Sequence, residues 1–287
     1  MQFSIYRWAF FGVFSKIFME TTATMERISS RKCQEYAELV YTSELAPVLR
    51  IGATSNIVSH CGIVDTPLIV GGVQAKHREF PHQAIIGYGD EVHWQCGGSV
   101  ISENYILTAA HCIDSRNRGR ASKVRVGLTD LRDPDHRMQE RNVIETIVHP
   151  DYHVPSRYND IALIKLDEPL TFNAEVRPAC LEINPTSTGK FIASGFGKTS
   201  YEAIVGSDQL MKVTLDHVTS EECGKMFESE VGGRRMTEGL APSQICAGVM
   251  AGGHDTCQVC HTWCSLFPEL MTNFFIRETA EDRSNES

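Results

Sequence analysis

The chain contains no apolar run long enough to cross a membrane, and no segment of it concentrates positive charge. A membrane-spanning helix needs about 20 consecutive apolar residues. Nucleic-acid binding needs a basic stripe, whereas the 27 Lys and Arg residues are scattered and outnumbered by 36 Asp and Glu residues, which leaves a net charge of -9. We therefore expect neither a membrane nor a nucleic acid as partner. With 287 residues, 42% of them hydrophobic, the chain has enough core for one large domain or two small ones.

Helical periodicity is also scarce. From Gln83 onward the chain consists of short β-rich runs separated by polar breaks, which are typical of all-β barrels or sandwiches. One short helix is predicted where Thr219 and Glu222 have the spacing of a capping box. Residues 27–68 show little periodicity and are expected to form a linker or pro-segment. The expected strands include residues 84–88, 123–126, 142–148, 160–166, 191–197, 209–215 and 244–248.

Ten cysteines are widely spaced along the chain. This usage fits an oxidising compartment better than the cytosol, so we expect a secreted protein with disulfides; the alternative is a set of buried reduced thiols. Near the N-terminus, Arg7 precedes the apolar residues 8–14 as in a short signal peptide, although Lys16 interrupts the run. We interpret residues 1–26 as a signal or leader segment, and the alternative is an arbitrary leader.

Three short sequence motifs indicate a catalytic site. Ile-Leu-Thr-Ala-Ala-His-Cys at residues 106–112 suits a strand that delivers a reactive imidazole, His111, to a loop. Ile-Val-Gly-Gly precedes it at residues 69–72, and Asn-Asp-Ile-Ala-Leu follows at residues 159–163. The order His, then Asp, with a Ser expected later, is one known chain order of a serine-protease triad. On these motifs, residues 69–258 resemble the trypsin/chymotrypsin-like (S1) family and, within it, arthropod clip-domain proteases of the Snake type.

This resemblance implies an all-β fold of two antiparallel β-barrels with the active site between them, and the hydrolysis of peptide bonds as the activity. It implies that His111 takes the proton of the nucleophile while Asp160 fixes the tautomer of the imidazole. Asp255 would pair with a substrate Arg or Lys at the base of the specificity pocket, unless it is an ordinary loop carboxylate. Cleavage between Leu68 and Ile69 would free an α-amine that turns inward and orders that pocket.

The sequence departs from the family where the nucleophile is expected. In place of Gly-Asp-Ser-Gly-Gly it has Val-Cys-His-Thr-Trp at residues 259–263. His261 stands at the position of the Ser, Cys260 at that of the Asp that receives the new amine, and Val259 at that of a Gly whose N–H helps to hold the oxyanion. We interpret residues 259–287 as a non-homologous tail after a truncated protease domain, so the second barrel is expected to be incomplete.

The resemblance also implies three disulfides, each of which typically adds about 2–4 kcal/mol of stability. One of them would keep the pro-segment attached to the protease domain after cleavage. The implied pairs are Cys96 with Cys112, Cys223 with Cys246 and, as the tether, Cys61 with Cys180. Because Cys33 alone precedes Cys61, the six-cysteine clip module of such relatives is expected to be absent.

Two sets of residues could hold a metal or cofactor, and neither is favoured. Cys-Gln-Val-Cys-His at residues 257–261 spells a haem-attachment motif and, with Cys264, offers zinc ligands, but no haem pocket or second ligand cluster accompanies it. Asp133, Asp135 and Glu140 lie in a loop where some family members hold calcium, although loop carboxylates are usually just solvated. We therefore expect no cofactor and no metal.

Two hypotheses for the function remain. In the first, the chain is a protease homologue or truncated isoform that lacks the nucleophile and does not cleave peptides. In the second, it is an active, secreted trypsin-like endopeptidase zymogen whose tail is a splice or gene-model artefact. In both, the resemblance implies an extracellular proteolytic cascade, such as melanisation or Toll activation. Its partners would be protein substrates, other cascade proteases and serpins.

Overall fold

The protein is described from a computed structural model of the chain. The structure describes residues 28–38, 41–44, 56–59, 73–115, 118–132, 137–181, 190–197, 206–248 and 271–272. Within these ranges no helix is both long and apolar enough to cross a membrane. Several residues that the sequence singles out lie outside the described residues: the leader 1–26, Cys61, Leu68, Ile69, Asp133, Asp135, Asp255, Cys257, Val259, Cys260, His261 and Cys264.

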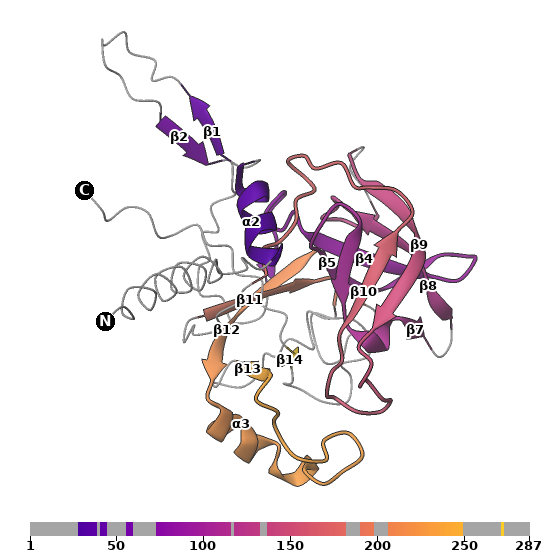
Figure 1. Ribbon diagram of the computed structural model, residues 1–287, viewed down its shortest axis with the longest axis vertical. Coiled ribbons are helices and arrows are strands. Elements are labelled where there is room, and N and C mark those ends of the chain that lie inside the picture. The colour runs from indigo at the N-terminus through magenta and orange to yellow at the C-terminus, as the bar shows by residue number, and fades with distance from the viewer. Residues whose placement is uncertain are drawn as a thin grey trace, which may run out of the picture.

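Six antiparallel strands close into a barrel between residues 83 and 166 (Figure 1). They lie in the order β4-β5-β6-β10-β9-β8, and β8 pairs back with β4, so the ring of hydrogen bonds has no open edge. β10 illustrates the sequence pattern, because Ala162, Ile164 and Leu166 alternate with less buried residues and belong to the barrel core. The strands are β4 (Gln83–Tyr88), β5 (His93–Val100), β6 (Tyr105–Thr108), β8 (Gly119–Val126), β9 (Gln139–Val148) and β10 (Ala162–Leu166), with the short β7 (Asp114–Ser115) beside β8.

A second antiparallel sheet contains five strands. β11, β12, β13 and β14 are hydrogen-bonded in this order, and β3 pairs with β12. Phe191, Val213 and Leu215 lie in its core. No pairing among the described residues closes this sheet into a ring. The predicted fold class, all-β with two antiparallel barrels of which the second is incomplete, is thereby confirmed for the part of the chain that the structure describes. The strands are β3 (Val73–Gln74), β11 (Lys190–Gly195), β12 (Met211–Val218), β13 (Gln244–Gly248) and β14 (Met271–Thr272).

The helix predicted from the capping box is present as α3 (Ser220–Met226). The hydroxyl of Thr219 accepts a hydrogen bond from the backbone N–H of Glu222, and the Glu222 carboxylate accepts one from the backbone N–H of Thr219. Both exchanges satisfy N–H groups that a helix start otherwise leaves without partners. A short 3-10 helix, η2 (Glu228–Glu230), follows α3.

The two sheets are joined through a shared core and through backbone hydrogen bonds. The N–H of Leu210 donates to the carbonyl of Thr129 over 2.8 Å, and the N–H of Leu131 donates to the carbonyl of Asp208 over 2.8 Å. These bonds attach the loop after β8 to the segment that enters β12. The shared core contains Phe80, Ile85, Leu128, Phe196 and Leu210.

Within residues 27–68, where the sequence predicts only a linker, the structure contains a helix, α2 (Ile28–Glu38). Tyr36 is its anchor, since its ring packs edge-on against Phe172 with 5.4 Å between ring centroids and its hydroxyl donates to the Glu103 carboxylate over 2.8 Å. Short isolated helices are marginal in water, so this contact with the first barrel explains a helix that local sequence does not signal. A two-stranded sheet of β1 (Tyr41–Glu44) and β2 (Asn56–Ser59) follows it.

The pairing of Cys180 requires a correction. The resemblance implies Cys61 as its partner, whereas the structure joins Cys180 to Cys33 of α2. The docked helix brings the Cα atoms of Cys33 and Cys180 to 5.1 Å, within the range that a disulfide spans. A covalent tether between residues 27–68 and the segment after β10 is therefore present, but it starts from a helix that the sequence analysis did not foresee.

Candidate active site

The pairing of β6 with β10 brings His111 and Asp160 together. In this antiparallel pair Ala162 lies opposite Thr108, so the C-terminal end of β6 and the N-terminal end of β10 meet at the same end of the barrel. His111 comes three residues after Thr108, and Asp160 comes two residues before Ala162. The two side chains are 49 residues apart in the chain, yet this register alone places them on adjacent loops.

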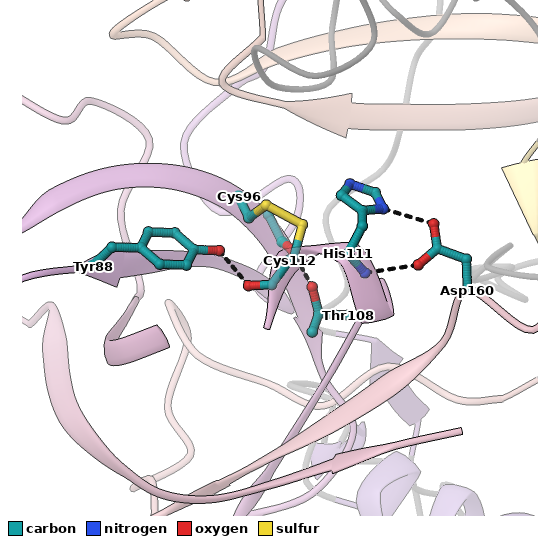
Figure 2. Close-up of a disulfide and its surroundings, with 7 residues drawn as sticks. Tyr88, Cys96, Thr108, His111, Cys112 and Asp160 are labelled. Atoms are coloured by element: carbon teal, nitrogen blue, oxygen red, sulfur yellow. Dashed lines mark hydrogen bonds and ion pairs between the residues drawn. A yellow bond between two sulfur atoms is a disulfide. The ribbon is translucent and has the colours of Figure 1, made fainter. Parts of the chain in front are cut away.

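The carboxylate of Asp160 contacts His111 through both of its oxygens (Figure 2). One oxygen is 2.6 Å from the ring Nδ1, and the other accepts the backbone N–H of the same histidine over 2.8 Å. With Nδ1–H held by the carboxylate, Nε2 is the nitrogen that takes up a proton. The side chain of His111 is 45% exposed and that of Asp160 only 18%, so the ring is accessible while its partner is shielded. An accessible imidazole held in this way is chemically able to act as a general base.

His111 lies in a short 3-10 helix, η1 (Ala110–Cys112), that is fastened on both sides. The disulfide between Cys96 and Cys112 ties this turn to β5, and the hydroxyl of Tyr88 donates to the carbonyl of Cys112 (Figure 2). Burial raises the pKa of the Tyr88 phenol above its ordinary value, so it stays a neutral donor. These contacts fix the backbone that carries the imidazole.

The backbone next to Asp160 is set by a tight turn. Asn159 has a φ of 57°, in the left-handed region that Asn tolerates better than most residues. The N–H of Ile161 donates back to the carbonyl of Asn159 over 2.8 Å, and the carbonyl of Ile161 accepts from the N–H of His149 over 3.1 Å. The Asn that precedes the Asp in the sequence motif therefore has a conformational role.

A second group of supporting residues was missed by the sequence analysis. The hydroxyl of Tyr158 donates to the carbonyl of Gly239 over 2.6 Å, and the backbone N–H of Arg157 donates to the carbonyl of Arg235 over 3.0 Å. The guanidinium of Arg157 also lies 2.9 Å from the carboxylate of Glu230. These contacts tie the Asp160 loop to the loop after α3. Tyr158 and Gly239 are 81 residues apart, so no local pattern could have indicated the pairing.

Of the residues that the sequence analysis considered as metal ligands, only Glu140 lies among the described residues, and it belongs to β9 instead of a loop. The structure also brings together three other potential ligands, which the sequence analysis did not consider. Ligand atoms of Cys96, His111 and Cys112 lie within 4.8 Å of one another, but the two sulfurs are joined in the disulfide and are not thiolate ligands. Glu140 is paired with Lys123 at 2.6 Å and Arg125 at 2.7 Å. The hydrogen bond from Lys123 and then that from Arg125 hold the pKa of the Glu140 carboxyl below its ordinary value. Its charge is therefore already balanced by two cations.

The structure thus brings together only part of the predicted site. His111 and Asp160 form their pair, and the described disulfides include the two implied pairs Cys96–Cys112 and Cys223–Cys246. The predicted pocket residue Asp255, the predicted cleavage site Leu68–Ile69 and the position of His261 lie outside the described residues, and they stay predictions.

Comparison with known proteins gives a consistent match. A sequence model of the trypsin family matches residues 69–259. The chain is 35% identical to Serine protease snk of Drosophila melanogaster over 241 residues, which cover 81% of this chain and 53% of that protein. It is 34% identical to Serine protease Hayan of the same organism, over 66% of this chain and 31% of the relative. It is also 33% identical to CLIP domain-containing serine protease B4 of Anopheles gambiae, over 69% and 58% respectively. The chain therefore spans between 31% and 58% of the length of these three relatives.

Proposed function

Because the chain belongs to the trypsin family of serine proteases, we propose that it is a protease homologue that has kept the proton-handling pair and lost the nucleophile. The observation that supports this is a contrast. The His111–Asp160 pair is formed, whereas residues 259–261 read Val-Cys-His where the family has Gly-Asp-Ser. The match to the family also ends at residue 259, where this departure begins. We expect no peptide-bond cleavage by this chain.

The physical reason lies in what the imidazole needs. In this chemistry Nε2 of the histidine takes the proton of a hydroxyl, and that oxygen attacks the carbonyl. His261 supplies no hydroxyl for that step. Loss of the Ser alone would leave a weak rate from the oxyanion hole. Val259 replaces the Gly that contributes to that hole, and a β-branched residue resists unusual backbone angles, so this residual rate is expected to be lost as well.

The proposal extends to the bond between Leu68 and Ile69, as a site for an activator that prefers large apolar residues. Val73, four residues after Ile69, is already paired with β12, so only a short segment is free to rearrange after the cut. Cys260 stands where the carboxylate that receives the new amine is expected, and a buried ammonium is stable only with a counter-charge. Cleavage is therefore expected to leave the chain inactive. The Cys33–Cys180 bond keeps residues 1–68 attached.

A fluorophosphonate probe tests the proposal, because it labels only an activated serine. Residues 64–68 are replaced by the enteropeptidase recognition sequence, the protein is cut, and probe labelling and hydrolysis of an arginyl ester are measured beside trypsin as positive control. Neither signal is expected from this chain. Labelling that disappears in the His111→Ala variant would overturn the proposal.

The tether is tested on the same sample, since the cut material is expected to run as one species without reductant and as two with it. Cys33→Ser should release the smaller piece without reductant, whereas Cys61→Ser should not. Release by Cys61→Ser would instead favour the pairing implied by the sequence.

A second candidate function is an active trypsin-like endopeptidase with Asp255 selecting Arg or Lys. The geometry that favours it is the 2.6 Å contact between His111 and Asp160, which is already suited to catalysis. Probe labelling in the experiment above would select this candidate. Under either function, three disulfides support secretion, and the serine proteases among the relatives support protein substrates or other proteases as partners. The proposal includes serpins as further partners, on the family resemblance alone.

A further inference from the structure

The loop between η2 and β13 presents a pair of arginines near the surface. Residues 231–234 are exposed, Arg235 is half-buried, and Met236 is completely buried. Gly232, with a φ of 85°, and Gly233 come directly before Arg234. In Figure 1 this loop follows α3 at the lower end of the molecule. The loop is therefore exposed as far as Arg234 and anchored in the core immediately after Arg235.

We propose that the bond between Arg234 and Arg235 is a cleavage site for an arginine-specific serine protease. Such a protease places the Arg side chain that precedes the scissile bond in a pocket with a carboxylate, so this side chain must be accessible. Exposed loop tips with small residues are preferred sites of such cleavage. Water supplies the oxygen of the new carboxylate on Arg234, and its protons pass to the new amine of Arg235 as the C–N bond breaks.

The hydrogen bonds that hold the tip are few and local. The N–H of Gly232 donates to the carbonyl of Met236 over 2.9 Å, and the N–H of Met236 donates back to Gly233 over 3.2 Å. A third bond runs from the N–H of Gly233 to the carbonyl of Glu230 over 3.1 Å. A side chain added at Gly232 would meet no atom within 4 Å, so the loop is open on this side, two residues before Arg234. Opening this tip leaves the strands of both sheets intact.

The neighbouring bond, after Arg235, is protected. The carbonyl of Arg235 accepts the backbone N–H of Arg157 over 3.0 Å, and the next residue, Met236, packs in the core around α3. A protease that cuts after Arg235 has to pull both groups away, whereas a cut after Arg234 starts from exposed residues. The structure therefore distinguishes two adjacent arginines that the sequence presents as equivalent.

The products of this cut remain one molecule. Cys223 in α3 lies on one side of the loop and Cys246 in β13 on the other, and the two are joined in a disulfide. The new amine at Arg235 also remains next to Arg157, three residues before Asp160. The cut thus adds a charged amine beside the loop that carries Asp160. It does so without releasing a fragment.

The test is a brief trypsin digestion of the native full chain, followed by mass spectrometry of the new amino termini. A terminus that begins Arg-Met-Thr-Glu at residue 235 is expected, in material that separates only after reduction of Cys223–Cys246. Arg234→Gln should abolish this terminus, and the matched Arg235→Gln should still be cut after Arg234. Arg234→Lys should make the same bond a substrate for a lysine-specific endoproteinase that leaves the unmodified loop uncut. A first cut after Arg235, or an Arg234→Lys loop that this endoproteinase does not cut, would overturn the proposal.

Discussion

The first barrel and the second sheet differ in where their hydrogen bonds end. In the barrel, Ala84 of β4 pairs with Val126 of β8, and the ring is closed. In the second sheet β14 adds only two paired positions to β13, and no described strand joins it back to β11. The second sheet instead relies on neighbours, through the buried ion pair of Lys212 with Glu79 and the 2.9 Å hydrogen bond from Ser194 to Gln83. Both units have buried cores of their own, but the first closes its ring of hydrogen bonds, whereas the second, as far as it is described, stays open and also contacts its neighbours.

This difference explains how the site is divided. His111 and Asp160 both sit on loops of the closed barrel, where the register of β6 against β10 brings them together. The parts that the family resemblance assigns to the nucleophile and the oxyanion hole belong to the second unit, where the sequence departs. Under the proposed function, the proton-handling pair persists because it belongs to the unit that keeps the family motifs.

Matched core truncations should give the largest effect and separate the two units. Ile164 in the barrel and Leu215 in the second sheet are both fully buried. Each change to Ala is expected to lower the free energy of unfolding of its own unit by about 4 kcal/mol, because it removes buried methyl groups and leaves a cavity. Ile164→Ala should speed hydrogen exchange in strands of both units, whereas Leu215→Ala should speed it in β11, β12 and β13 only. Mass spectrometry of exchanging peptides measures this.

Equal effects of the two variants on the first barrel would contradict this prediction. If Leu215→Ala accelerated exchange in β4, β8 and β10 as much as Ile164→Ala does, the two units would unfold together. The contrast drawn from their strand pairing would then have no energetic meaning.

A buried histidine at the junction gives the next largest effect. His82 precedes β4 and packs edge-on against Phe80 of the shared core. Burial lowers the pKa of His82 from 6.5 to about 4, so the folded protein resists protonation while the unfolded chain accepts it. Stability is therefore complete above pH 6.5 and falls as the pH drops toward 4, by on the order of 3 kcal/mol from this group. Urea midpoints measured across that range should follow this decline.

The matching variant is His82→Leu, which removes the titrating group and keeps an apolar side chain of similar size. The urea midpoint of this variant should change much less between pH 6.5 and pH 4 than that of the unmodified chain. A variant that keeps the full pH dependence would assign it to other residues.

Some elements of this molecule can be predicted from its sequence, because the patterns that indicate them lie within a few neighbouring residues. The β-rich run at residues 160–166, the capping box at Thr219 and the Thr-Ala-Ala-His-Cys motif each involve a few neighbouring residues, and each corresponds to an element found in the structure. The pairing of His111 with Asp160 also follows from family resemblance, although its physical cause is the register of β6 against β10.

The parts that the sequence did not indicate depend on contacts between distant segments. α2 has no strong helical pattern and is held by Tyr36 against Phe172. The choice of Cys33 over Cys61 as the partner of Cys180 follows from that docking. An interaction between segments more than a hundred residues apart leaves no periodicity in either segment, so only the folded structure shows it.

The smallest expected effect concerns this docked helix. Tyr36→Phe keeps the ring contact with Phe172 but removes the 2.8 Å hydrogen bond to Glu103, worth about 1 kcal/mol. Because about 1 kcal/mol corresponds to about a fivefold change in an opening equilibrium, the rate of hydrogen exchange in α2 should rise about fivefold. The exchange rates in β11 to β13 should not change. Tyr36→Ala, which also loses the ring contact, should raise it further although Cys33–Cys180 still holds the segment nearby. If both variants matched the unmodified chain, the disulfide alone would hold α2, and the helix would add nothing to the closed barrel.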